Sequence, residues 1–128
     1  MVSKQIKIVV MICLIVIVLV GCESEYDKLI KEYDNAYKEI VNQIDPQSVT
    51  KSIRDNDLLS RYEQLDGLLQ KIGENAQDGK LSDIVLLRDK HDTLGKLLER
   101  CLKWDNLKGL EKLAAEDTLE SLKAEYNK

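Results

Sequence analysis

The sequence has no Phe, and it has only one Pro, one His and one Trp among its 128 residues. A single Pro excludes a proline-rich linker, and a single His excludes any site that needs paired histidines. The motifs of several enzyme classes are also missing: there is no Cys-x-x-Cys pair, no glycine-rich phosphate loop and no Gly-x-Ser-x-Gly elbow. Arg88 occupies the position three before His91, where a Glu-x-x-His metal motif has Glu. The sequence therefore predicts no enzyme activity, no bound metal and no cofactor.

The formal net charge is −4 and the pI is about 5.1, which argues against binding to nucleic acid through bulk charge. This charge is unevenly distributed along the chain. Residues 1–21 contain two Lys and no acidic residue, whereas residues 22–128 contain 17 basic and 23 acidic side chains. The second part can bury one hydrophobic core and is too short for two ordinary domains.

The longest apolar run lies near the N-terminus. Lys4 and Lys7 precede thirteen uninterrupted apolar residues, Ile8–Val20, and Gly21 and Cys22 follow them. A positive start, an apolar stretch of this length and a small residue at its end are the parts of an export signal. Thirteen helical residues reach about 20 Å, which is less than the ~30 Å hydrocarbon core of a bilayer. The run is therefore short for a membrane-spanning helix.

The end of this run, Leu19-Val20-Gly21-Cys22, resembles the lipobox of bacterial lipoproteins. The resemblance implies that residues 1–21 are a lipoprotein signal peptide cleaved between Gly21 and Cys22, with a diacylglyceryl group on the Cys22 sulfur. The protein is then anchored by its lipid at the bacterial cell membrane, since two acyl chains suffice for stable attachment. The alternative is an uncleaved signal anchor in which Cys22 is incidental. Both interpretations place residues 23–128 on the extracytoplasmic side, because Lys4 and Lys7 stay in the cytoplasm.

Helical periodicity runs through residues 24–126, without the alternation that is typical of strands. The first predicted helix covers residues 26–44 and ends at Asp45-Pro46. Asp45 is expected to cap a second, short helix in which Pro46 occupies the first turn. The triplet Asp55-Asn56-Asp57 is expected to end that helix and to cap the next one.

The third predicted helix starts at Leu58 and ends before the turn signal Asp78-Gly79. Ser82 is expected to cap the helix that follows. Leu81 before the cap and Leu86 after it are expected to pack together as a hydrophobic staple.

The apolar stripe of this later segment changes phase near residues 104–109, which predicts a break rather than one continuous helix. Four main helices of about 20 residues, or 30 Å, would result, and their matched lengths favour an up-down antiparallel arrangement. The alternative is a three-helix core whose last helix overhangs and pairs with a second copy. The predicted fold class is all-α: residues 26–128 form a single domain, a small antiparallel helical bundle with three to four main helices.

Residues 22–25 form a very short tether between the lipid and the first predicted helix. The three residues between Cys22 and Tyr26 reach only about 10 Å when extended, which places Tyr26 near the lipid headgroups. Glu23, Glu25 and Asp27 suit the N-terminus of a helix because acidic side chains interact favourably with its dipole. The domain is therefore expected to lie close to the membrane surface.

Two residues of chemically reactive types lie on the apolar stripes. Cys101 is the one free thiol expected once Cys13 leaves with the signal and Cys22 is lipidated. A small buried side chain is the simpler interpretation of Cys101, and an intermolecular bridge or redox role is the alternative. His91 is expected to be a core histidine with a hydrogen-bond partner, and a pH-sensitive switch is its alternative.

Two sets of residues are candidates for binding. A basic strip around the sole Trp would contact a partner protein, since Arg and Trp are enriched in binding hot spots; alternatively, the Trp closes one end of the core. A set of tyrosines would line a partly wet groove beside the first helix; alternatively, these rings pack at the edge of the core. The strip consists of Lys96, Arg100, Lys103, Trp104 and Lys108, and the tyrosine set consists of Tyr26, Tyr33, Tyr37 and Tyr62.

These features together predict a membrane-anchored interaction module that contacts another envelope or surface protein. Immunity or exclusion lipoproteins and subunits of envelope or secretion assemblies are the classes that such a size and location suggest by analogy. The alternative function is a small carrier that binds an apolar or lipid ligand within the bundle. The expected partners are the membrane, through the lipid, and a second protein, with a homo-oligomer as a further possibility.

Overall fold

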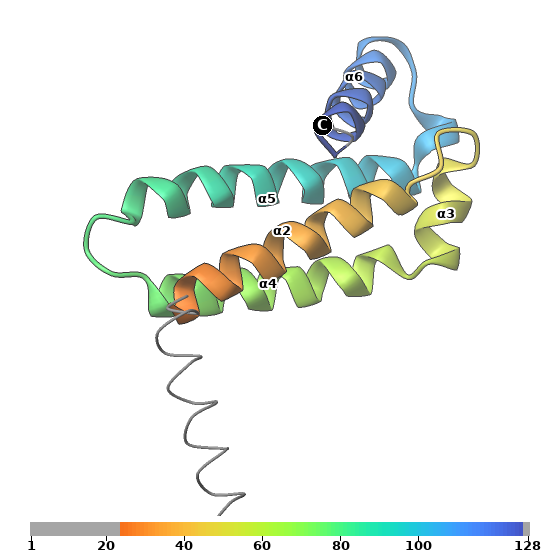
Figure 1. The fold of residues 1–128 in the computed structure, drawn as a ribbon. Coiled ribbons are helices and arrows are strands. Elements are labelled where there is room, and N and C mark those ends of the chain that lie inside the picture. The colour runs from red at the N-terminus through yellow and green to blue at the C-terminus, as the bar shows by residue number, and fades with distance from the viewer. Residues whose placement is uncertain (1–23, 127–128) are drawn as a thin grey trace, which may run out of the picture.

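The computed structural model describes residues 24–126, so the predicted cleavage and lipidation site at Gly21 and Cys22 lies outside the described residues. Within this range the chain is helical and contains no strand, which confirms the predicted all-α class (Figure 1). Five α-helices pack together, and one 3-10 helix, η1, precedes the last of them. Their bounds are α2 Glu25–Gln43, α3 Val49–Asp55, α4 Leu58–Asn75, α5 Leu81–Leu102, η1 Trp104–Asn106 and α6 Gly109–Tyr126.

Helix α2 begins at Glu25, one residue earlier than predicted, because Ser24 caps it. The Ser24 hydroxyl accepts a hydrogen bond of 3.1 Å from the backbone N–H of Asp27. Glu25 and Asp27 lie in the first turn, where their negative charge stabilises the helix dipole.

Asp45 and Pro46 end the first helix region as predicted, but the expectation that Asp45 caps the next helix is wrong. The Asp45 carboxylate accepts a hydrogen bond of 2.9 Å from the Gln47 N–H, and the Asp45 carbonyl accepts one of 3.1 Å from the Ser48 N–H. These bonds form a turn, so α3 begins only at Val49.

The predicted stop after α3 is confirmed, since α3 ends at Asp55 and α4 begins at Leu58. Asp57 occupies the cap position of α4 with a left-handed backbone (φ 52°) and makes no side-chain cap hydrogen bond. Asp is among the few non-glycine residues that tolerate this conformation. The chain therefore reverses here through the backbone of Asp57 rather than through its carboxylate.

Helices α2, α4 and α5 lie side by side, and α4 runs antiparallel to the other two (Figure 1). Each of them turns one apolar stripe inward, and α3 closes the end of the bundle with Val49 and Ile53. The core formed in this way contains no Phe, and Tyr33 is its largest fully buried side chain. The other large side chains of under 2% exposure are Ile40, Val41, Ile44, Ile53, Leu58, Leu65, Ile72, Leu94, Leu97, Leu98 and Cys101.

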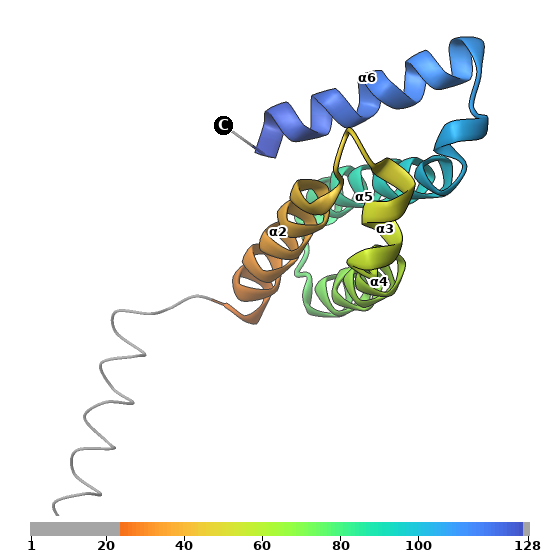
Figure 2. The same cartoon turned by 90° about the vertical axis from the view of Figure 1, so that its right-hand side faces the viewer.

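The break near residues 104–109 is confirmed, since η1 and a short loop separate α5 from α6. The four long helices have 19, 18, 22 and 18 residues, as the sequence predicts. Helix α6 does not extend the up-down arrangement, however, because it crosses the other helices steeply (Figure 2). Gly109, with φ 61°, lies at the turn that sets this direction. The structure therefore has three core helices with α6 packed across them, and the pairing of the last helix with a second copy stays a prediction.

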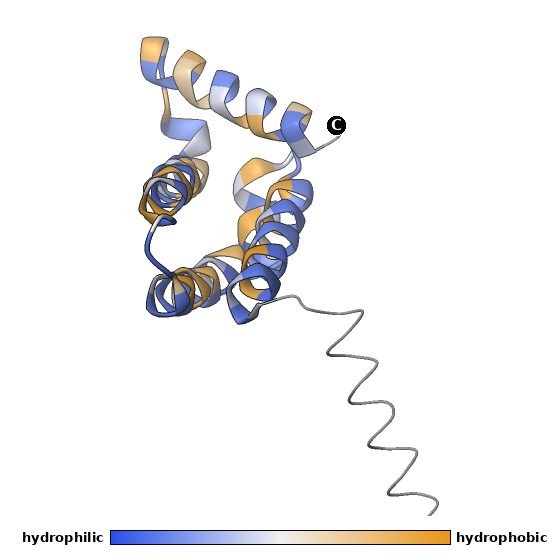
Figure 3. Ribbon diagram, turned by 60° about the vertical axis from the view of Figure 1, so that its left-hand side comes forward, coloured by the Kyte–Doolittle hydropathy of each residue, from blue (hydrophilic) through white to orange (hydrophobic). Residues whose placement is uncertain are grey.

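The crossing also changes which leucines of α6 are buried. Leu110 and Leu113, in the first turns of α6, have exposed fractions of 85% and 61%. Ala115, Leu119 and Leu122 contact the core instead. Hydrophobic bands are accordingly visible in Figure 3 on the part of α6 farthest from its C-terminus.

Two lysine side chains of α6 donate hydrogen bonds to backbone carbonyls of other elements. The Lys123 ammonium donates hydrogen bonds to the carbonyl oxygens of Val41 (3.0 Å) and Asn42 (3.5 Å), near the C-terminus of α2. Helix α2 has no basic residue in its own last turn, so the Lys123 ammonium supplies the positive charge that stabilises the C-terminal end of its dipole. Lys112 donates to the Trp104 carbonyl at 2.8 Å.

The start of α5 differs from the prediction. The helix begins at Leu81, with Lys80 rather than Ser82 at the cap position. Leu81 and Leu86 are 73% and 68% exposed, so the predicted hydrophobic staple is wrong. The turn before the helix is as expected, with Gly79 at φ 96°. Among the described residues, no helix combines the length and apolar content needed to cross a bilayer.

Candidate functional site

His91 lies at the junction of the three core helices and is 3% exposed. Its Nδ1 atom is 3.1 Å from the hydroxyl of Tyr33 on α2, and its Nε2 atom is 3.2 Å from a carboxylate oxygen of Asp66 on α4. The Tyr62 ring stacks on the imidazole with a centroid distance of 4.4 Å. The Tyr62 hydroxyl also donates to the His91 carbonyl at 3.0 Å. We call these four residues the His91 cluster.

The hydrogen bonds of the His91 cluster match the neutral imidazole. The Asp66 carboxylate accepts, so Nε2 carries the proton, and Nδ1 is then free to accept a hydrogen bond from the Tyr33 hydroxyl. Burial lowers the pKa of His91, and the negative charge of Asp66 opposes this change only in part. The neutral form is therefore the form that the fold stabilises.

The order Tyr33, His91, Asp66 is formally that of a nucleophile, a base and an orienting carboxylate. Tyr33 is only 1% exposed, however, and burial raises the pKa of its hydroxyl. A hydroxyl that is closed off from solvent and held in its protonated form cannot attack a substrate. In this arrangement the cluster links α2, α4 and α5.

The His91 cluster predicts that stability decreases in mild acid. The unfolded chain takes up a proton near the ordinary His pKa of about 6.5, whereas folded His91 takes it up only at lower pH. The free energy of unfolding should be highest above pH 6.5 and should fall as the pH decreases toward the folded pKa. The decrease is about 1.4 kcal/mol for each pKa unit that separates the two states.

Urea unfolding between pH 5 and pH 7.5 measures this dependence. Because His91 is the single His of the chain, His91→Gln is a matched control. The variant should lose the slope between pH 5.5 and 7 that the wild type shows. An unchanged slope in His91→Gln would exclude His91 as its origin.

The remaining tyrosines of the predicted groove do not share one surface. Tyr37 is 3% exposed and donates to the Lys90 carbonyl at 3.4 Å, while the Lys90 ammonium lies 4.5 Å from its ring centroid. Tyr26 is 9% exposed and packs near Lys80 at the start of α5. Tyr26 and Tyr37 line separate surface hollows, and the hydroxyls of Tyr33, Tyr37 and Tyr62 are bonded within the protein. These tyrosines therefore pack at the core, and they do not line one common groove.

Cys101 is fully buried on α5, and burial raises the pKa of its thiol to about 12. The thiolate, which is the reactive form, is therefore disfavoured. The Cys101 carbonyl accepts a hydrogen bond of 2.7 Å from the Thr50 hydroxyl, which ties α3 to α5. Cys101 acts here as a small core side chain.

The basic strip lies partly where the sequence predicts it. Lys96, Arg100 and Lys103 follow one another at spacings of four and three residues, on the face of α5 opposite the buried Leu94 and Leu98. Lys96 and Lys103 are exposed and Arg100 is half-buried. In the part of the chain that the structure describes, none of these three side chains makes an ion pair. Lys108 is exposed in the loop before α6 and is likewise unpaired there.

Trp104 belongs to a different surface. Its half-buried ring packs beneath the Lys112 ammonium, 4.1 Å from the ring centroid. The ring also lines a cleft of about 530 Å³ between η1, the loop after α2 and the inner side of α6. The other residues that line this cleft are Pro46, Glu116, Leu119, Glu120, Lys123 and Ala124. The structure therefore does not place Trp104 in one cleft with the basic residues of the strip.

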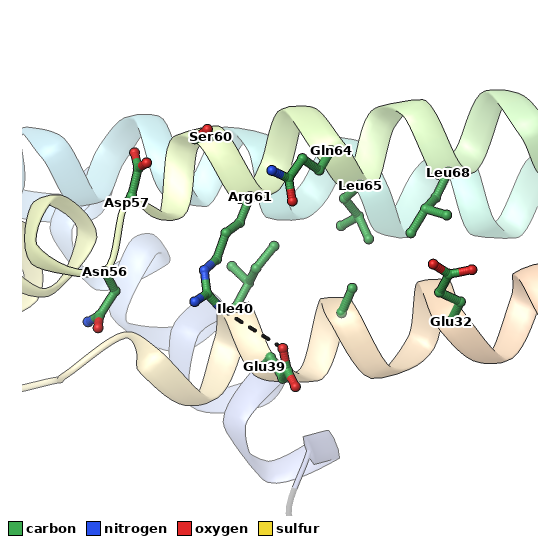
Figure 4. A pocket seen from close by; sticks show the side chains of 11 residues that line it. Glu32, Glu39, Ile40, Asn56, Asp57, Ser60, Arg61, Gln64, Leu65 and Leu68 are labelled. Atoms are coloured by element: carbon green, nitrogen blue, oxygen red, sulfur yellow. Dashed lines mark ion pairs between the residues drawn. The ribbon is translucent and has the colours of Figure 1, made fainter.

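A groove that sequence reasoning missed runs between α2 and α4 (Figure 4). It has a volume of about 490 Å³, and Ile40, Leu65 and Leu68 form its apolar part. Arg61 of α4 and Glu39 of α2 face each other across it at 3.8 Å. No motif marks this groove in the sequence, because it exists only where two distant segments pack together.

Among the described residues, no group of three or more His, Cys, Asp or Glu side chains is placed to hold a metal ion. No protein family model, curated protein or solved structure matches the chain. The candidate binding surface is therefore defined by its own residues, namely the unpaired basic side chains Lys96, Arg100 and Lys103.

Proposed function

We propose that the protein is a lipid-anchored interaction module that contacts an acidic partner protein at the extracytoplasmic face of a bacterial membrane. The lipobox-like segment that ends at Cys22 supports the anchor and the location. The beginning of α2 at Glu25 supports closeness to the bilayer, since only Glu23 and Ser24 then separate Cys22 from the helix. Two extended residues reach less than about 10 Å.

The observation that carries the partner contact is the unpaired basic strip. Lys96, Arg100 and Lys103 repel one another at helical spacings of three and four residues. Their position near the C-terminus of α5 offsets part of this repulsion through the helix dipole. An acidic surface on a second protein would remove the rest and would be guided to the strip electrostatically. Such a strip is notable in a chain whose net charge is −4.

The partner class follows from size and location. A single helical domain held at the membrane surface can block, protect or complete another envelope protein by covering part of it. An exclusion or immunity role and a role in an envelope or secretion assembly are both consistent with this action.

Charge reversal of the strip tests the proposal. A photo-crosslinking residue at position 103 of the full-length protein, expressed in bacterial membranes, should give a discrete adduct with a second protein. Lys96→Glu plus Arg100→Glu should reduce the yield of this adduct roughly tenfold, because reversing charges at the rim of an interface weakens encounter and binding. Mass spectrometry of the adduct should identify a cross-linked peptide rich in Asp and Glu.

Lys71→Glu is the matched control, since Lys71 is an exposed lysine of α4, away from the strip. It should leave the adduct unchanged, and circular dichroism should show the same helicity in all variants. An adduct that persists in the double variant at physiological salt would contradict the assignment of the strip.

A further inference from the structure

The first two turns of α5 carry more exposed apolar surface than the rest of the core helices. Leu81, Val85 and Leu86 have exposed fractions of 73%, 54% and 68%. Ile84 and Leu87, in the same two turns, are half-buried against the core. Five of seven consecutive residues are thus aliphatic, and they surround the helix rather than forming one stripe. The protein core covers only the side of Ile84 and Leu87, so Leu81, Val85 and Leu86 stay exposed to solvent.

This apolar tip lies at the end of the bundle where the chain enters α2 (Figure 1). Tyr26 of α2 lines the same surface hollow as Leu86 and Leu87. A neighbouring hollow is lined by both Ser24 and Lys80, which flank the starts of α2 and α5. Since Ser24 is the second residue after Cys22, the exposed leucines lie beside the exit of the anchored segment.

We propose that the apolar tip formed by Leu81, Val85 and Leu86 inserts into the boundary between headgroups and acyl chains of the lipid bilayer. The inference rests on the proposed function in one respect, namely that the chain before Ser24 holds the domain at a membrane. It holds equally for an acylated Cys22 and for an uncleaved apolar anchor. The membrane then covers the sides of α5 that the core leaves open, and the η1 end of the bundle points away from the lipid.

The charges at this end indicate how the tip binds. Two hollows next to Tyr26 are lined by three acidic residues, Glu25, Asp27 and Asp83, and by two basic residues, Lys80 and Lys90. Attraction to anionic lipid is therefore not the main source of binding. Apolar insertion should instead proceed in zwitterionic phosphatidylcholine and should change little with salt, because salt screens only charge interactions.

Helix α5 supplies an internal reference for depth. It has 22 residues, which corresponds to about 33 Å, and Trp104 follows its far end. A tryptophan at position 86 and the natural Trp104 should therefore report opposite ends of the same helix. Bromine atoms on acyl chains quench only tryptophans within contact range, so the two positions should be clearly distinguished.

The test uses the full-length protein, purified from membranes and reconstituted into phosphatidylcholine vesicles with acyl chains brominated near the headgroup. The Leu86→Trp, Trp104→Phe variant should lose about half of its fluorescence relative to vesicles without bromine, since interfacial apolar side chains lie ~5–10 Å deep. The wild type, whose only fluorophore of this kind is Trp104, should be nearly unaffected. Adding Leu81→Glu and Val85→Glu to the Leu86→Trp variant should remove most of the quenching.

Flotation of the vesicles separates the possible failures. If the protein floats with the vesicles but the tryptophan introduced at position 86 is quenched no more than Trp104, the anchor stands and the insertion of the tip is disproved. If the introduced tryptophan is shielded both from brominated lipid and from aqueous iodide, another protein or a second copy covers the tip and the inference is wrong. If the wild-type protein does not float, the anchor itself is disproved, and the inference falls with it.

Discussion

Serine in place of Cys22 is expected to abolish fatty-acid labelling of the protein and to leave it at the size of the uncleaved precursor. The expectation follows from the lipobox-like segment Leu19-Val20-Gly21-Cys22, whose resemblance to bacterial lipoproteins implies that the Cys22 sulfur carries the lipid. The uncleaved precursor keeps the apolar run Ile8–Val20, so the label and the size, rather than membrane attachment, report the loss of the lipid. The measurement is metabolic labelling with a fatty acid, combined with gel mobility and membrane fractionation.

Cys101→Ser is the matched control for this experiment, because its side chain is buried in the core and far along the chain from the signal. It should retain the label and the mature size, even if the core is somewhat less stable. An unlabelled wild type that has the same size as Cys22→Ser, with both proteins bound to membranes, would exclude the lipid anchor. An uncleaved signal anchor would then be the remaining explanation for membrane attachment.

Alanine in place of Gly95 is expected to destabilise the fold by about 1 to 2 kcal/mol, although alanine is the better helix former by about 1 kcal/mol. A Cβ atom at Gly95 would lie 2.8 Å from Cζ of Tyr62 and would also overlap the Tyr62 hydroxyl. The ring would have to leave its stack on His91 and its hydrogen bond to the His91 carbonyl. Each of these interactions contributes on the order of 1 kcal/mol, so their combined loss outweighs the gain in helix propensity.

A double-mutant cycle isolates this effect. In a Tyr62→Leu background the clash is absent, and Gly95→Ala should stabilise the protein by roughly 0.5 to 1 kcal/mol. Gly67→Ala on α4 is a further control, because a Cβ atom there meets nothing within 4 Å and should likewise stabilise. Urea unfolding of the five proteins measures the cycle. If Gly95→Ala stabilises in both backgrounds, the close contact between Tyr62 and Gly95 does not limit the fold.

The helix boundaries could be predicted where they depend on local chemistry. Asp45-Pro46, the triplet at residues 55–57 and Asp78-Gly79 all end or precede helices near their predicted places. The capping residues were less predictable. Asp45 and Ser82 are of residue types that often cap helices, but Ser48 and Lys80 occupy the cap positions of α3 and α5. Cap preference identifies a region, and the surrounding packing then selects the residue.

The path of α6 could not be predicted from its sequence. Leu110 and Leu113 lie on one face of this helix, whereas Leu119 and Leu122 lie on another, so the apolar pattern supports two orientations. The turn through η1 and Gly109 decides between them. The orientation of α6 depends on where the preceding helices lie, and the apolar periodicity of α6 carries no information about their position.

The candidate site shows the same limit. The burial of His91 could be predicted from its place on an apolar stripe, but its partners could not. Tyr33 and Asp66 are 58 and 25 positions away, and neither forms a recognisable motif with it. The basic strip could be found because its members lie on one helix, whereas Trp104 was separated from it by a turn in the chain.

The cap that Lys123 supplies to α2 joins residues 82 positions apart. In the export that we propose, the N-terminal end leaves the cytoplasm first, so Val41 emerges long before Lys123. The contact between Lys123 and the end of α2 can then form only after nearly the whole polypeptide has been translocated.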